Sequence, residues 1–119
     1  MVQAVRMVMH LEVFQLVLLR RPSDAPEVDE DVAERIQREH LAFYDQQRAA
    51  KTVVTNGPVL DQPDETLRGL AFFNVGSLER ARDIANADPA VLNGRLEVEV
   101  MSWWCPAGTM SQSGTPITV

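Results

Sequence analysis

Apolar and polar positions along the chain predict six structural elements, four of which are strands. Two nearly continuous apolar runs, rich in β-branched and aromatic residues, are typical of strands that are covered on both faces. A third strand is short and stops at Gly57-Pro58, and a fourth alternates strictly between apolar and polar side chains, which indicates a half-buried strand. The four predicted strands are residues 13–20, 67–75, 52–56 and 95–104.

A long helix is predicted over residues 29–50. Acidic side chains crowd its start and basic side chains lie at its end, as the helix dipole favours. At 100° per residue, Val32 and Ile36 share an apolar stripe that also contains His40. Tyr44 falls at the margin of this stripe. The helix is therefore expected to turn His40 towards the sheet.

A second helix is predicted to begin after Ser77, which is a good N-cap residue. Asp88-Pro89 ends it, because the residue before proline avoids the helical conformation. The resulting order, βαββαβ, predicts an α+β fold of the ferredoxin-like kind, with two helices on one face of a four-stranded antiparallel sheet.

The face of the predicted sheet that carries no helix is also apolar, since the first and third strands are apolar on both sides. A bare apolar sheet face is a large exposed patch, and such patches usually mark an interface. The simplest way to bury it is against the same face of an identical chain. We therefore expect a homodimer that closes sheet to sheet.

Three regions divide the chain. Residues 1–12 are a lead-in of uncertain structure, and residues 13–105 form the folded domain. Residues 106–119 are polar, carry no charged side chain and are rich in Gly, Ser and Thr. This composition predicts a flexible tail, or an arm that becomes ordered on a partner.

Charge and composition narrow the class of protein. The net charge is −6, Lys51 is the only lysine and Arg20-Arg21 is the only basic doublet. Neither nucleic acid nor an anionic membrane surface is therefore expected as a partner. The apolar N-terminal segment is interrupted by polar residues and has no small-residue cleavage site, so it predicts neither a signal peptide nor a membrane span. The single cysteine, Cys105, permits no intrachain disulfide and fits a reducing cytoplasm.

Sequence motifs give no basis for a metal or a nucleotide cofactor. His10 and His40 are the only histidines, and no cysteine pair or His-x-x-x-His spacing occurs. Walker-type loops, GxGxxG and GxSxG elbows are absent from the sequence. We therefore predict a protein that uses no cofactor and no metal.

His40 and Asp88 are the two candidate chemical groups, and each has a structural alternative. An imidazole can both take and give a proton near neutral pH, but a core histidine bonded to a backbone carbonyl fits the same stripe. Asp88 precedes Pro89, where an aspartate commonly bonds to the backbone of its own turn. From these residues alone, the turn remains the simpler interpretation of Asp88.

Four short segments stand out by their order and spacing, and they span about residues 13–104. They are Arg38-Glu39-His40-Leu41, Asn56-Gly57-Pro58, Ser77-Leu78-Glu79-Arg80-Ala81 and Asn86-Ala87-Asp88-Pro89, the last followed by Gly94. In this order they resemble the helical His-Leu motif, the Gly-Pro after the second strand, the start of the second helix and the Asp-Pro turn of the YCII-related family. The longer lead-in and the tail depart from that pattern.

The resemblance implies a dimeric α/β barrel related to muconolactone isomerase, with an active site built on a His-Asp pair. Carried over to this chain, the pair is His40 and Asp88. A carboxylate bonded to one imidazole nitrogen would fix the tautomer of the ring and stabilise its charged form. One characterised type within this family eliminates HCl from a chlorinated hydroxyquinone without a cofactor.

Five further residues are candidates for contact with a small-molecule substrate. Gly57 permits a turn or a close approach of substrate to the backbone, and Pro58 fixes that turn. Tyr44 lies one helical turn beyond His40 and can donate a hydrogen bond, or it is a core tyrosine. Gln15 and Asn74 are polar residues inside apolar strands, and they line a pocket, reach solvent or meet the dimer partner.

The leading hypothesis is a cofactor-independent acid-base enzyme, a lyase such as a dehydrochlorinase or an isomerase, that acts on a small cyclic or aromatic molecule. Proton transfer next to a carbonyl suits a lone acid-base pair in an apolar pocket. Two alternatives remain open. The same scaffold serves non-catalytic dimeric modules that bind small molecules, and it also serves cofactor-free monooxygenases, which consume oxygen.

Overall fold

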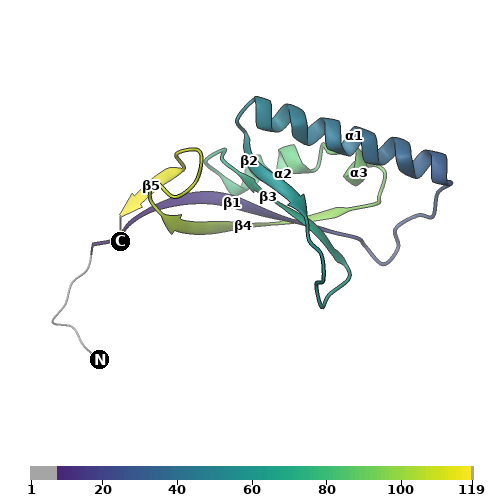
Figure 1. Cartoon of the computed structure of the whole chain (residues 1–119), viewed down its shortest axis with the longest axis horizontal. Helices are drawn as coiled ribbons and strands as arrows, with labels where there is room; N and C mark the ends of the chain where they lie inside the picture. Colours follow the sequence, from purple (N-terminus) through teal and green to yellow (C-terminus); the bar gives the residue numbers. More distant parts are fainter. Residues whose placement is uncertain (1–7, 119) are drawn as a thin grey trace.

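The helices lie on one face of an antiparallel sheet in the computed structural model, which describes residues 8–118 (Figure 1). Within this part of the chain there are five strands and three helices. They are β1 (His10–Arg20), α1 (Glu30–Ala49), β2 (Val53–Pro58), β3 (Leu67–Phe73), α2 (Leu78–Ala85), α3 (Pro89–Leu92), β4 (Glu97–Pro106) and β5 (Thr115–Thr118). The α+β class predicted from the sequence is confirmed.

The strand order is β2-β3-β1-β4, so β1 and β3 are the central strands of a ferredoxin-like sheet. β4 pairs along almost the whole of β1, whereas β3 pairs only with its second half, from Gln15 to Arg20. β5 pairs with the first half of β1, on the edge that β3 leaves free. Figure 1 shows β1 and β4 extending past the helices to the end where β5 lies.

The segment after residue 105 differs from the flexible tail that its composition predicts. It turns back and adds β5 to the sheet of the same chain. The carboxylate of Glu12, which is buried, accepts hydrogen bonds from the backbone N–H groups of Gly108 and Gly114. The side-chain amide of Asn74 also donates to the Ser113 carbonyl, at 2.9 Å. Polar contacts with the body of the domain therefore order this segment, and its own apolar pattern gives no sign of them.

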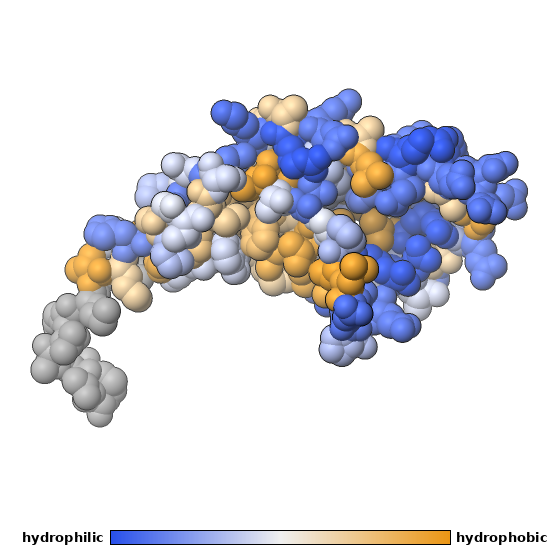
Figure 2. Space-filling view, in the orientation of Figure 1, coloured by the Kyte–Doolittle hydropathy of each residue, from blue (hydrophilic) through white to orange (hydrophobic). Residues whose placement is uncertain are grey.

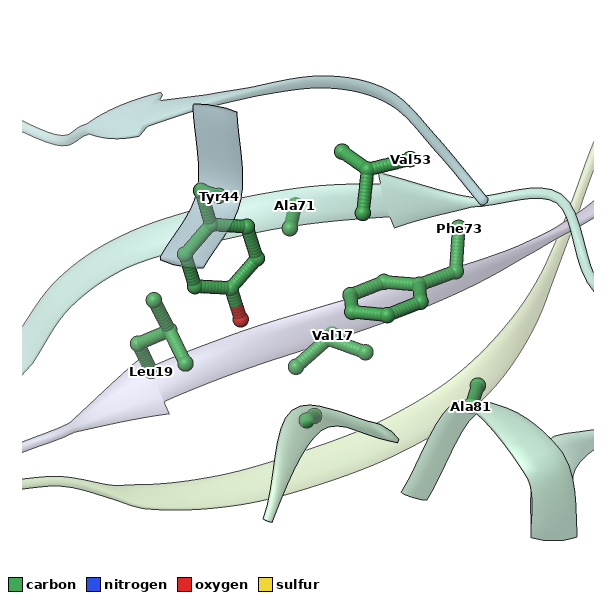
Figure 3. Close-up of a cluster of buried hydrophobic side chains, with 8 residues drawn as sticks. Val17, Leu19, Tyr44, Val53, Ala71, Phe73 and Ala81 are labelled. Atoms are coloured by element: carbon green, nitrogen blue, oxygen red, sulfur yellow. The ribbon is translucent and has the colours of Figure 1, made fainter. Parts of the chain in front are cut away.

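The hydrophobic core lies between the helices and the sheet (Figure 3). Tyr44 was predicted at the margin of the apolar stripe, but its side chain is fully buried. Its ring makes edge contacts with the rings of Phe43 and Phe73. The small side chains of Val17 and Ala71 on the facing strands leave room for the phenol ring, which is why a margin position can be a core position here.

The opposite face of the sheet is not covered by any helix of the described chain. Side chains alternate along a strand, so the neighbours of the core residues on β1 and β3 point to this second face. Figure 2 shows apolar side chains gathered below the helices, over the strands. We call this surface the open sheet face; its residues, all half-buried, are Leu16, Leu18, Leu70, Phe72, Met101 and Trp103. The homodimer that would bury it stays a prediction.

Local sequence signals explain where the shorter helices start. The Ser77 hydroxyl accepts a hydrogen bond from the backbone N–H of Arg80 at 3.1 Å, which confirms it as the N-cap of α2. α2 already ends at Ala85, before Asp88-Pro89, and this dipeptide begins α3, because proline is well suited to the first turn of a helix. In the part of the chain that the structure describes, no helix combines the length and apolar character that a membrane crossing needs.

Candidate active site

A cavity of about 310 Å³ lies between α1 and the sheet, at the end where β1 and β2 finish. One wall is apolar and is built from Leu19, Ala33, Ile36, Leu41, Ala90 and Leu96. The polar and backbone groups of the cavity come from Arg21, Gln37, His40, Asn56, Gly57, Pro58, Arg68, Gly69 and Arg95. A volume of this size suits a small molecule, and the mixture of an apolar wall with a few polar groups is typical of ligand sites.

His40 and Asp88 meet at the side of this cavity, although 48 residues separate them in the sequence. Nδ1 of His40 lies 2.7 Å from Oδ2 of Asp88. The side chain of His40 is 12% exposed and that of Asp88 is fully buried. The carboxylate thus stands behind the imidazole, on the side away from solvent.

Asp88 is held in place by a second hydrogen bond. Its other oxygen, Oδ1, accepts from the backbone N–H of Ala90 at 2.9 Å, so the same side chain caps the first turn of α3. Both carboxylate oxygens therefore have a partner, which a buried carboxylate requires. The turn contact of Asp88 and its contact with His40 coexist, because each uses a different oxygen, and the catalytic role of the pair stays a prediction.

The orientation of the imidazole follows from these contacts. A carboxylate accepts hydrogen bonds, so Nδ1 of His40 carries the proton and donates a hydrogen bond to Asp88. That tautomer leaves Nε2, with its lone pair, as the ring nitrogen available to the cavity. The edge of the Tyr44 ring packs against the imidazole, with ring centroids 5.2 Å apart, and limits its rotation.

Gly57 and Pro58 line the cavity, as the sequence suggested for substrate contacts. The turn that we expected there is wrong, because both residues belong to β2 and Gly57 has no positive φ. The glycine that does have a steric role is Gly69 on β3. A Cβ atom there would lie 2.9 Å from the carbonyl oxygen of Gly57, so Gly69 allows the two strands to approach at the cavity wall.

Three other predicted substrate contacts lie outside the cavity. Oε1 of Gln15 accepts a hydrogen bond from the backbone N–H of Val75 at 2.8 Å, which fixes the loop before α2. Asn74 holds the segment after β4, as described above. The Tyr44 hydroxyl is buried and has no hydrogen-bond partner among residues 8–118, and burial raises the pKa of its phenol. These residues stabilise the domain and are not placed to contact a ligand in this cavity.

The sequence analysis missed the arginines at the cavity. Arg21 follows the end of β1, Arg68 lies at the start of β3, and Arg95 lies just before β4. In an antiparallel sheet the end of one strand meets the starts of its two neighbours, so the predicted topology already brought these three positions to one edge. Their wide separation along the sequence concealed the cluster. Among residues 8–118, no group of three or more His, Cys, Asp or Glu side chains is placed to hold a metal ion.

The antiparallel sheet with its helices on one face defines a ferredoxin-like α+β domain. The YCII-related domain family model matches residues 15–104, and the chain belongs to this family. No curated protein matches the sequence.

One similar solved structure is that of 5-chloro-2-hydroxyhydroquinone dehydrochlorinase from Burkholderia phenoliruptrix AC1100, in complex with 2,5-dihydroxybenzoquinone. The TM-score is 0.54 and the sequence identity 15%, over 80% of this chain and 95% of that chain. At this identity the likeness shows a shared fold.

Proposed function

We propose that this protein is a cofactor-independent acid-base enzyme, of the lyase or isomerase type, that acts on a small cyclic or aromatic molecule. His40 is the proposed catalytic base and acid, and Asp88 is the proposed positioning residue. The proposal is supported by the family and by the shared fold of a dehydrochlorinase.

One observation carries the proposal: a histidine at the side of a cavity, backed by a fully buried carboxylate at 2.7 Å. A negative charge behind the ring stabilises the imidazolium that forms when Nε2 takes a proton. A buried carboxylate such as that of Asp88 is costly to desolvate unless it is paired, and His40 supplies that partner.

The proposed reaction begins when Nε2 removes a proton from a carbon next to a carbonyl group, or from a ring hydroxyl. The electron pair left behind forms an enolate. In an isomerase the imidazolium returns the proton to another carbon of the conjugated system. In a lyase the electron pair forms a new double bond, a leaving group such as chloride departs with the pair of its breaking bond, and the proton passes to water.

A direct assay separates this reaction from its two alternatives. We would incubate the protein with 5-chloro-2-hydroxyhydroquinone, and with cyclic enones in D₂O, and record chloride release, deuterium uptake at carbon and oxygen consumption. We expect chloride release or deuterium uptake without consumption of oxygen. Turnover that consumes oxygen would instead establish a monooxygenase. Binding of these compounds without any of the three signals would establish a binding module.

A further inference from the structure

Positive charge is concentrated at the cavity in a chain whose net charge is −6. Arg21, Arg68 and Arg95 line the cavity, and we call them the arginine cluster. The chain has 17 Asp and Glu residues, yet none of them is among the residues that line this cavity. In the described range 8–118, no carboxylate lies within 4.0 Å of an arginine of the cluster, whereas Arg20 pairs with both Asp64 and Glu99.

Arg21 has a buried polar atom that no group among residues 8–118 satisfies. Its Nε atom is buried and has no hydrogen-bond partner within the described chain. Burial lowers the pKa of Arg21, and the positive charges of Arg95 and Arg68 lower it further. A buried donor without a partner is unfavourable, and so is a group of like charges without a counter-ion. An anion that enters the cavity relieves the repulsion among these like charges.

We infer that the cavity binds a small organic anion, with a planar oxyanion group such as a carboxylate or an enolate at the arginine cluster and an apolar ring against the wall formed by Leu19, Ile36 and Leu41. This inference rests on the proposed function and names the class of its substrate. Guanidinium groups present a fork of donors that matches a planar oxyanion, which favours a carboxylate or enolate. The apolar residues that line the same cavity favour a ligand with a hydrophobic body.

The same arrangement assists the proposed chemistry. Removal of a proton next to a carbonyl places negative charge on oxygen, and this charge develops inside the cavity that holds the cluster. Guanidinium groups fixed by the fold stabilise that charge without reorganising. Arg95 is fixed in this way, since its Nη1 donates to the carbonyl of Pro26 at 2.8 Å.

The experiment is an NMR titration of the isotopically labelled protein with three probes. Benzoate is the ring anion, benzamide is its neutral counterpart and inorganic phosphate is an anion without an apolar body. We expect saturable shifts at the cavity residues with benzoate, and binding of benzamide and phosphate that is weaker by about tenfold or more, as the loss of a charge-assisted contact implies. Benzoate and benzamide that bind equally would overturn the inference. Phosphate that binds at the cavity more tightly than benzoate would also overturn it, in favour of an inorganic anion site.

Arg68→Gln tests the cluster itself, because Arg68 is exposed and its side chain makes no ion pair within the described chain. The matched control is Arg82→Gln, which removes the same charge from an exposed position on α2, away from the cavity. We expect Arg68→Gln to weaken benzoate binding by about tenfold and Arg82→Gln to leave it unchanged. Equal affinities in the two variants would overturn the inference. Arg21→Lys, which keeps the charge but loses the fork, is a second test and is also expected to weaken binding.

Failure of this inference can be told apart from failure of the proposed function. Benzoate binding depends on the cluster, whereas proton transfer depends on His40. If turnover requires His40 but benzoate does not bind, only the proposed anion site is refuted. If benzoate binds but the protein shows no turnover, only the proposed enzymatic function is refuted.

Discussion

Asp88 is predicted to have two separable roles, because its two oxygens bond to different partners. Asp88→Ala removes both contacts. Loss of the cap on α3 costs about 0.5–2 kcal/mol. The His40 Nδ1–H group left without a partner in a partly buried site costs about 1–3 kcal/mol. We expect the free energy of unfolding to fall by roughly 2–4 kcal/mol, as measured by urea denaturation followed by circular dichroism.

Asp88→Asn keeps the cap and changes the chemistry. The amide oxygen can still accept from the Ala90 N–H, while the amide NH₂ group faces His40 and donates to Nδ1. That contact favours the tautomer with the proton on Nε2, which cannot act as a base. We expect a loss of stability of only about 1 kcal/mol and a fall in turnover no larger than that of His40→Asn, about two to four orders of magnitude.

The matched control for both substitutions is Asp83, which is exposed on α2. Asp83→Asn and Asp83→Ala make the same chemical changes without touching His40 or α3. Wild-type turnover in Asp88→Asn would refute the positioning role of this carboxylate. If Asp88→Ala is no less stable than Asp83→Ala, then the double hydrogen bonding of Asp88 is refuted as well.

Three further predictions concern the rest of the fold. Tyr44→Phe removes a buried hydroxyl that has no hydrogen-bond partner in the described chain, so it should change the free energy of unfolding by less than about 1 kcal/mol at pH 7. Because burial raises the pKa of the phenol, the stability of the wild type should fall above about pH 10. Urea denaturation should show a smaller fall in the variant. Gly114→Ala places a Cβ atom 2.7 Å from the Phe14 ring and should lower the free energy of unfolding by about 1–3 kcal/mol. In Gly57→Ala the new Cβ atom meets no atom within 4 Å, so the loss of stability should be smaller. Equal losses in the two variants would contradict the packing of Gly114 against Phe14. Light scattering should give twice the chain mass for the wild type and the single chain mass for Phe72→Glu, which charges the open sheet face; a wild-type monomer at micromolar concentration would end the dimer prediction.

The order of the main elements and the inward position of His40 could be predicted because both depend on local periodicity. Apolar runs and one strictly alternating segment identified the four main strands, and the helical stripe contained His40. The contact between His40 and Asp88 depends on α3 packing beside α1 and joins residues far apart in the sequence. The residues alone therefore left Asp88 as a turn residue, and only the family resemblance indicated the pair.

Two features were missed because the interactions that create them are distant in the sequence. β5 forms where Glu12 binds backbone groups of residues 108 and 114, and the uncharged composition of that segment gives no sign of this. The arginine cluster forms because the end of β1 meets the starts of β3 and β4. The predicted ferredoxin-like topology implies this cluster, but the arginines are scattered along the sequence and form no local motif.

The most direct test of the proposed enzyme is the turnover number of His40→Asn, measured on the substrate that the chloride or deuterium assay identifies. The control is His10→Asn, the same substitution at the exposed histidine that begins β1. Because general acid-base catalysis contributes about two to four orders of magnitude, kcat should fall by that amount in His40→Asn and stay at the wild-type value in His10→Asn. A folded His40→Asn protein with the kcat of the wild type would contradict the acid-base mechanism that assigns proton transfer to His40.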